Sequence, residues 1–324
     1  MTYSKTLQGR FVATGFPAAI MLFVSLLLWV IGYLLHVDAG STIMSTLGFD
    51  FVGDTFARLL SMLSFVGTAF VLNHLYLFEQ RVAYLPHLFL WLVSVQLFLQ
   101  PDCLAAMALL LFMLSVAQLL SCCQESGQEK SVYAAFAILS FSSLFLLQFL
   151  YLLPLFFVYL LIAKIFMVRN FFAALLGVVT PFWLLFGVIF VFPSLSSLLM
   201  PLKFGLLNML APVDMAFSLQ EWITLGTELL VWVVAAVVFF VSSFPAKPLL
   251  RRRMLFLLVV NIYLYILNFI LPQDYSLLLA WRLPCTAVMV AYVFSMRVTR
   301  LSNIYFITLN ILWLLTASLC LWIV

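Results

Sequence analysis

The stretch Leu257-Leu-Val-Val-Asn-Ile-Tyr-Leu-Tyr-Ile-Leu-Asn-Phe-Ile270 decides the fold class of this chain. Its apolar residues are continuous, whereas a β-strand that spans a membrane alternates apolar and polar residues. Inside a membrane, a continuous run of this kind satisfies its own backbone hydrogen bonds only as an α-helix. Similar runs follow one another along most of the sequence. The chain is therefore predicted to be an all-α, polytopic transmembrane helical bundle.

The composition excludes most classes of soluble protein. Hydrophobic residues make up 67% of the 324 residues and charged residues only 8%, whereas a soluble domain is roughly half apolar and a quarter charged. No globule of this length buries so much apolar surface behind so few charges. A soluble enzyme, a nucleic-acid-binding protein, a disordered chain and a disulfide scaffold are thus excluded.

About eleven spans fit into the chain. A bilayer core takes roughly 20 apolar residues per helix, so eleven helices leave only short connectors in 324 residues. Residues 132–168 are predicted as two short spans that divide near Pro154, because a single helix of that length is far longer than a membrane is thick. The predicted spans, within a few residues, are 14–35, 55–78, 83–99, 103–121, 132–149, 151–168, 171–192, 222–243, 254–271, 276–296 and 304–324.

Basic residues predict the direction of the chain in the membrane, and a long outer connector predicts its division into two bundles. With the N-terminus inside, twelve of the fifteen Lys and Arg residues fall on the cytoplasmic side, and only Arg58, Lys203 and Arg282 fall on the other. This positive-inside bias requires an odd number of spans and places the C-terminus outside. The outer connector 193–221 is apolar but interrupted by Pro and Gly, which favours an interfacial or re-entrant segment. It separates a predicted N-terminal bundle, 1–192, from a C-terminal bundle, 222–324.

A few charged residues fall inside or beside predicted spans, where a charge at the bilayer centre costs about 2.5–3.5 kcal/mol. Glu228 and Arg282 lie well inside their spans, and Arg58 lies one turn after Asp54. In the predicted topology these residues and Asp50 all lie toward the outer face. Two interpretations remain open: the charges form ion pairs that only hold the bundle together, or they form an anion site. In such a site, Arg binds a phosphate and a carboxylate acts as a base or proton relay.

Asparagines add a polar stripe to one span. Asn261 and Asn268 lie at positions i and i+7, with Tyr265 between them at i+4, so the three share a helix face. Interhelical hydrogen bonds explain such stripes more often than ligand contacts do. As candidate substrate-binding residues we nevertheless retain Asn261 and Asn268, together with Arg58 and Arg282.

No metal or cofactor site is predicted. His36, His74 and His87 lie near different membrane faces, and the five cysteines form no CxxC motif. Neither set has the spacing of a zinc site. The composition implies membrane lipids as partners and no nucleic acid.

Three short motifs in the middle of the chain resemble a known family. They are Val71-Leu-Asn73-His74, Arg81-Val-Ala-Tyr84-Leu-Pro86 and Phe171-Phe-Ala-Ala-Leu-Leu-Gly177-Val-Val-Thr180-Pro181-Phe182. Through these motifs, roughly residues 55–193 resemble an uncharacterised multi-span inner-membrane family, a domain of unknown function common in Bacteroidetes. The resemblance implies a multi-pass protein of the bacterial inner (cytoplasmic) membrane, in the cell envelope, and it carries no activity.

The layout is similar, more loosely, to that of membrane glycosyltransferases that use polyprenyl-phosphate sugars. This resemblance implies a polyprenyl-phosphate-linked substrate, a catalytic base at Asp50 or Asp54 in the first outer loop and phosphate binding by Arg58 and Arg282. Glu228 is a third candidate catalytic carboxylate. The same charges fit a transporter or flippase in which Glu228 carries a coupling proton, and a non-catalytic scaffold of a cell-envelope complex is the third hypothesis. Whether the protein is an enzyme stays open.

Overall fold

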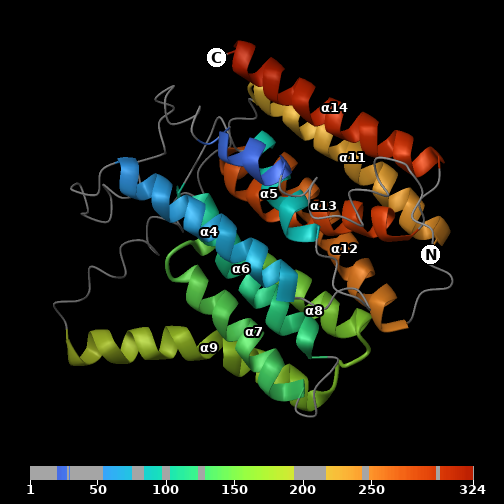
Figure 1. Ribbon diagram of the computed structural model, residues 1–324. Coiled ribbons are helices and arrows are strands. Elements are labelled where there is room, and N and C mark those ends of the chain that lie inside the picture. The colour runs from blue at the N-terminus through green and yellow to red at the C-terminus, as the bar shows by residue number, and fades with distance from the viewer. Residues whose placement is uncertain are drawn as a thin grey trace. The chain divides into compact units, whose positions relative to one another are not determined.

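The computed structural model describes residues 20–27, 29, 54–74, 84–96, 103–122, 128–192, 217–242, 248–296 and 300–323, and every regular element in these ranges is helical (Figure 1). The all-α prediction is thus confirmed for this part of the chain. The elements are α4 (Asp54–His74), α5 (Leu85–Gln96), α6 (Cys103–Ser121), α7 (Gln128–Ser143), η1 (Leu147–Leu152), α8 (Leu153–Ile162), α9 (Val168–Val191), α11 (Leu219–Ser242), α12 (Pro248–Ile270), η3 (Pro272–Asp274), α13 (Tyr275–Met296) and α14 (Arg300–Ile323), where η denotes a 3₁₀-helix.

Five helical segments in the described ranges are long and apolar enough to cross a membrane. They are Cys103–Ser121, Val168–Val191, Leu219–Val241, Pro248–Ile270 and Pro272–Ser295. Shorter apolar helices cover Leu59–His74, Leu85–Ser94, Leu147–Ile162 and Asn303–Thr316. The chain is therefore a multi-pass helical membrane protein in contact with lipid. The total of eleven spans, the direction of the chain and the identity of the membrane stay predictions.

The helices pack into two compact units. One unit combines Met1–Leu109 with Met215–Val324, and the other is Leu110–Asp214. In the first unit, α4 and α5 therefore belong with α11 to α14, although they precede α11 by more than a hundred residues. Residues 193–216, which contain most of the predicted connector, lie outside the described residues, so the predicted division there stays a prediction.

Helix α13 is the centre of the first unit. It packs against α5, α11, α12 and α14, and every residue in the 18-residue apolar window of the segment Pro272–Ser295 is buried within the protein. The side chains of Trp281, Leu283 and Met289 are all without exposed surface. A helix that is apolar on all sides is typical of the interior of a large bundle. The bundle thus surrounds α13, and the buried polar side chains on α13 face other helices of the bundle.

In the second unit, the chain between residues 132 and 168 divides earlier than predicted. Helix α7 ends at Ser143, residues 144–146 form a turn, and η1 leads directly into α8. Pro154 does not break the helix, because it lies in the first turn of α8, where its missing N–H costs nothing. Residues 132–168 thus contain two helical segments, but the predicted place of the division is wrong. That each segment spans the membrane stays a prediction.

Helices α7 and α9 approach each other closely at Gly177. A Cβ atom added to Gly177 would lie 2.7 Å from the Tyr133 carbonyl oxygen and 2.9 Å from the Phe136 Cβ. A glycine is needed here because backbone and Cβ atoms of α7 occupy the space of a side chain. Small residues at such crossings are a common device for packing helices in membranes.

Gly177→Ala should lower the free energy of unfolding of the second unit by about 1–3 kcal/mol, the usual cost of overpacking. Gly187→Ala, in the same helix, is the matched control, since a Cβ there meets nothing within 4 Å. Its expected effect is nil or slightly stabilising, because alanine favours helix over glycine. Thermal unfolding of the two purified variants checks this expectation. Equal transition temperatures would contradict the close α7–α9 packing.

Candidate functional site

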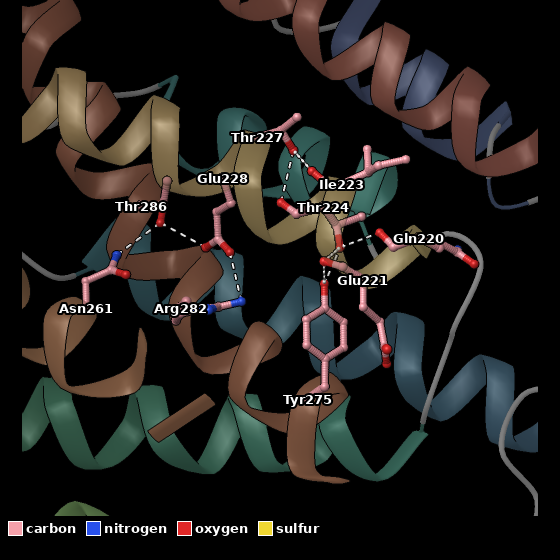
Figure 2. Close-up of polar contacts among 10 residues, drawn as sticks. All are labelled: Gln220, Glu221, Ile223, Thr224, Thr227, Glu228, Asn261, Tyr275, Arg282 and Thr286. Atoms are coloured by element: carbon pink, nitrogen blue, oxygen red, sulfur yellow. Dashed lines mark hydrogen bonds and ion pairs between the residues drawn. The ribbon is translucent and has the colours of Figure 1, made fainter. Parts of the chain in front are cut away.

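The candidate site lies where α11, α12 and α13 meet in the first unit. Helix α11 begins with a capping box, in which Ser218 and Glu221 satisfy each other's backbone N–H groups: Glu221 Oε2 accepts from Ser218 N at 2.7 Å, and Ser218 Oγ accepts from Glu221 N at 3.3 Å. The box fixes the start of α11. Two turns later, Glu228 points toward α13 (Figure 2).

A fully buried ion pair joins α11 to α13. Arg282 Nη2 lies 3.1 Å from Glu228 Oε2, and neither side chain has any exposed surface. Breaking a pair of this kind by removing one partner is costly, because the other charge is left without compensation. Glu228 and Arg282 are thus the two halves of one electrostatic unit.

Two further side chains extend this pair to α12. Thr286 Oγ1 donates to Glu228 Oε1 over 3.2 Å, and Asn261 Nδ2 donates to Thr286 Oγ1 over 3.0 Å. Figure 2 shows the carboxylate of Glu228 between Thr286 and Arg282, with Asn261 behind Thr286. A hydroxyl group donates one hydrogen bond and accepts up to two, so Thr286 can serve both neighbours at once.

The guanidinium of Arg282 is also oriented by an aromatic ring. Its Cζ lies 4.4 Å from the ring centroid of Tyr265 on α12, in the geometry of a cation–π contact. Tyr265 in turn packs against Trp232 of α11, with ring centroids 5.8 Å apart. The guanidinium is therefore held by two contacts, an ion pair with Glu228 and a cation–π contact with the ring of Tyr265.

Several buried polar atoms around this pair have no hydrogen-bond partner. They include Nε and Nη1 of Arg282, the hydroxyl of Tyr265, Oδ1 of Asn261 and both amide atoms of Asn268. Asn261 and Asn268 have no exposed surface. More than about 90% of buried polar groups in proteins do have a partner. A cluster of exceptions on the facing sides of α12 and α13 indicates a place that is completed by something other than these side chains.

A second contact between α11 and α13 lies closer to the N-terminal ends of both helices than the ion pair does. The hydroxyl groups of Thr224 and Tyr275 contact each other, and Tyr275 also donates to the backbone oxygen of Glu221 over 3.4 Å (Figure 2). Both contacts tie the first turn of α13 to the first two turns of α11. The end of the α11–α13 interface that lies beyond Arg282 is thus closed by hydrogen bonds.

Of the residues predicted from the sequence, the structure brings together Glu228, Arg282 and, through Thr286, Asn261. Asn268 lies on the same face of α12, one turn beyond Tyr265. Asp50 lies outside the described residues. Asp54 is the first residue of α4 and Arg58 lies one turn later, but their side chains are not described. The predicted roles of Asp50, Asp54 and Arg58 therefore stay predictions.

The sequence analysis overlooked Thr286, Thr224 and Tyr275. Thr286 lies four residues after Arg282, so the spacing on α13 was a usable signal, since positions i and i+4 share a helix face. The contact between Thr224 and Tyr275 joins residues far apart in the chain, and no local pattern indicates it. Among the described residues, no group of three or more His, Cys, Asp or Glu side chains could hold a metal ion.

Comparisons with protein-family models, with curated proteins and with solved structures found no match for this chain. Its function is therefore argued from the site alone.

Proposed function

We propose that this membrane protein handles polyprenyl-phosphate-linked glycans, as a transferase or a polymerase-like protein, at the outer face of the bacterial inner membrane. The observation that supports the proposal is the buried guanidinium of Arg282, whose Nε and Nη1 have no hydrogen-bond partner. A cation inside a membrane span is rare and usually functional. A lipid-linked phosphate is the anionic group that a protein meets within a membrane.

The chemistry of arginine suits this ligand. A guanidinium presents a rigid fork of N–H donors that matches a phosphate group with two parallel hydrogen bonds. In Arg282 one nitrogen contacts Glu228, and two others are unused. The ring of Tyr265 holds the fork in one plane, which reduces the entropy lost when a ligand binds. Glu228 then acts as the internal counter-ion of Arg282 until a phosphate binds.

Access to Arg282 requires movement, because the ion pair is fully enclosed. Both helices that carry it are weakened within two residues of the charge. Pro284 lies inside α13, where it removes a backbone hydrogen bond to residue 280. Gly226 lies inside α11, and a Cβ atom added to it would meet nothing within 4 Å. A glycine inside a helix costs about 1 kcal/mol of helix stability relative to alanine. These positions are where α11 and α13 bend most readily.

The proposed reaction also needs a base near the phosphate. Asp50 and Asp54, near the start of α4, are the proposed bases, and Arg58 is the proposed second phosphate ligand. Glu228 is the third carboxylate, and its contact with Arg282 suits it to a relay role rather than to attack on the substrate.

Arg282→Lys should weaken binding of farnesyl methyl phosphate, a short polyprenyl phosphodiester, by about 10- to 100-fold. Lysine keeps the charge that compensates Glu228 but lacks the fork, and a hydrogen bond to a charged group contributes about 1.5–3 kcal/mol. Calorimetry on the purified protein in detergent measures this affinity. Arg253→Lys is the matched control, since Arg253 is also buried in the first unit but lies at the start of α12.

In cells, Arg282→Lys and Asp54→Asn should each change the profile of surface glycans while the protein remains in the membrane at normal abundance. If both variants leave the glycan profile unchanged, the proposed function is wrong.

A transporter or flippase is the second candidate, and a specific observation favours it. The carboxylate of Glu228 is enclosed between Arg282 and Thr286, as expected for a coupling carboxylate in an occluded state. Uptake into proteoliposomes, measured with and without a pH gradient, separates this function from a transferase.

A further inference from the structure

In the described part of the chain, the carboxylate that contacts Arg282 is that of Glu228. The titratable groups that interact with Glu228 or with its neighbours there are Arg282, Cys285 and Tyr275 of α13, Tyr265 of α12 and Glu221 on α11 itself. Tyr305 of α14 donates to the backbone oxygen of Val231, about one turn further along α11. Tyrosine and cysteine are ordinarily neutral near pH 7. Glu221 belongs to the capping box at the helix start. The enclosed site therefore holds one positive and one negative charge, and its net charge is zero.

An anionic ligand upsets this balance. If it bound beside an ionised Glu228, the enclosed site would hold two negative charges and one positive charge. An uncompensated charge removed from water costs several kcal/mol, and inside a membrane the cost is of the same order. The ligand and the carboxylate of Glu228 are therefore competitors for Arg282. The least costly way to admit the ligand is to neutralise Glu228.

Resting on the proposed function, we infer that the site binds a phosphodiester anion together with one proton, which Glu228 takes up as Arg282 exchanges the carboxylate for the phosphate. The proton comes from the acid form of the buffer, which becomes its conjugate base, and it forms an O–H bond on the carboxylate. The ion pair between Glu228 and Arg282 breaks, and an ion pair between Arg282 and the phosphate forms. The net charge of the site stays zero before and after binding.

Thr286 fits both states of Glu228. Its hydroxyl now donates to Glu228 Oε1 and accepts from Asn261 Nδ2. A hydroxyl oxygen accepts a second hydrogen bond when its own hydrogen rotates away. A protonated Glu228 can therefore donate to Thr286 without displacing Asn261, and the neutral carboxyl stays satisfied in the interior. Glu228, Thr286 and Asn261 can therefore remain hydrogen-bonded to one another after Glu228 is protonated, and α12 does not have to move.

The proton count is measured by calorimetry on the purified full-length protein in detergent. The probes are dimethyl phosphate and farnesyl methyl phosphate, because a phosphodiester keeps one negative charge throughout the range and does not itself titrate. Titrations in buffers of different ionisation enthalpy should give one proton taken up for each probe bound. Over the pH range in which Glu228 is ionised in the free protein and protonated in the complex, the Kd should rise about tenfold for each pH unit, the slope that one linked proton imposes.

Glu228→Gln tests the assigned group. The variant should bind the probes without proton uptake and with a Kd that does not change with pH, because no carboxylate competes for Arg282. Glu221→Gln is the matched control on the same helix, and glutamine also supports a capping box. This control should keep both the proton uptake and the pH slope. A Glu228→Gln variant that retains the slope would overturn the inference.

If Glu228→Gln fails to fold, calorimetry on the wild-type protein alone still tests the inference. Binding of farnesyl methyl phosphate without proton uptake would overturn the inference and leave the proposed function standing. Binding of dimethyl phosphate alone, with one proton, would support the inference and overturn the lipid-linked substrate. Absence of binding by both probes at every pH would overturn both.

Discussion

Arg282→Met is expected to lower the free energy of unfolding by about 3–5 kcal/mol, the cost of leaving one member of a buried ion pair uncompensated. The partner that remains, Glu228, has no exposed surface, and in the described part of the chain its carboxylate contacts Arg282 and the uncharged Thr286. Methionine has a similar length to arginine and fills the same space, so the effect arises from charge rather than from a cavity. Glu228→Met should have an effect of similar size for the same reason.

The double variant Glu228→Met/Arg282→Met should recover most of the lost stability, since two packed apolar side chains often replace a buried pair without cost. A thiol-reactive dye measures thermal unfolding here, because the thiols of Cys103, Cys122 and Cys285 are buried in the folded protein and become accessible when it unfolds. The coupling energy follows from the four-member cycle. Additive losses in the double variant would show that the two charges do not depend on each other.

The helices themselves were predictable from the sequence. The run Leu257–Ile270 lies within α12 (Pro248–Ile270), and the predicted span 171–192 corresponds to α9 (Val168–Val191). Length and apolar continuity suffice for this prediction, because the membrane imposes both on any spanning helix. The turn at residues 144–146 was not predictable, since Leu144, Phe145 and Leu146 are as apolar as the helices that they separate.

Apolarity does not tell a helix in lipid from a helix in the protein interior. In the 18-residue apolar window of α9, 17% of the residues are buried, and in the corresponding window of α13 all residues are buried, although both helices are apolar enough to cross a membrane. Lipid and protein interior are nearly equivalent solvents for a leucine. The usable signal is the polar content, since Arg282 and Thr286 on α13 require polar partners that only the protein supplies.

For the site, the sequence predicted which ionised groups matter but not how they connect. Glu228 and Arg282 are conspicuous because ions are rare in apolar spans. Their pairing depends on the relative rotation of α11 and α13. No spacing rule carries that information between residues 54 positions apart.

Asn268→Leu is expected to raise the free energy of unfolding by about 1–3 kcal/mol, the usual penalty of a buried polar group without a partner. Neither amide atom of Asn268 has a hydrogen-bond partner, and its side chain is fully buried on α12. Leucine has a similar size and contains no polar atom. The same change should weaken binding of farnesyl methyl phosphate, because stability gained at a functional site commonly costs activity.

Asn261→Leu is the matched control, on the same face of the same helix. Asn261 donates to Thr286, so leucine there removes a hydrogen bond that supports Glu228, and stability should fall by about 1–3 kcal/mol. Changes of opposite sign in the free energy of unfolding would show that the Asn268 amide serves ligand binding and that the Asn261 amide stabilises the fold. If Asn268→Leu lowers the unfolding temperature as Asn261→Leu does, then Asn268 is a packing residue. The proposed ligand site would then consist of Arg282 and the ring of Tyr265.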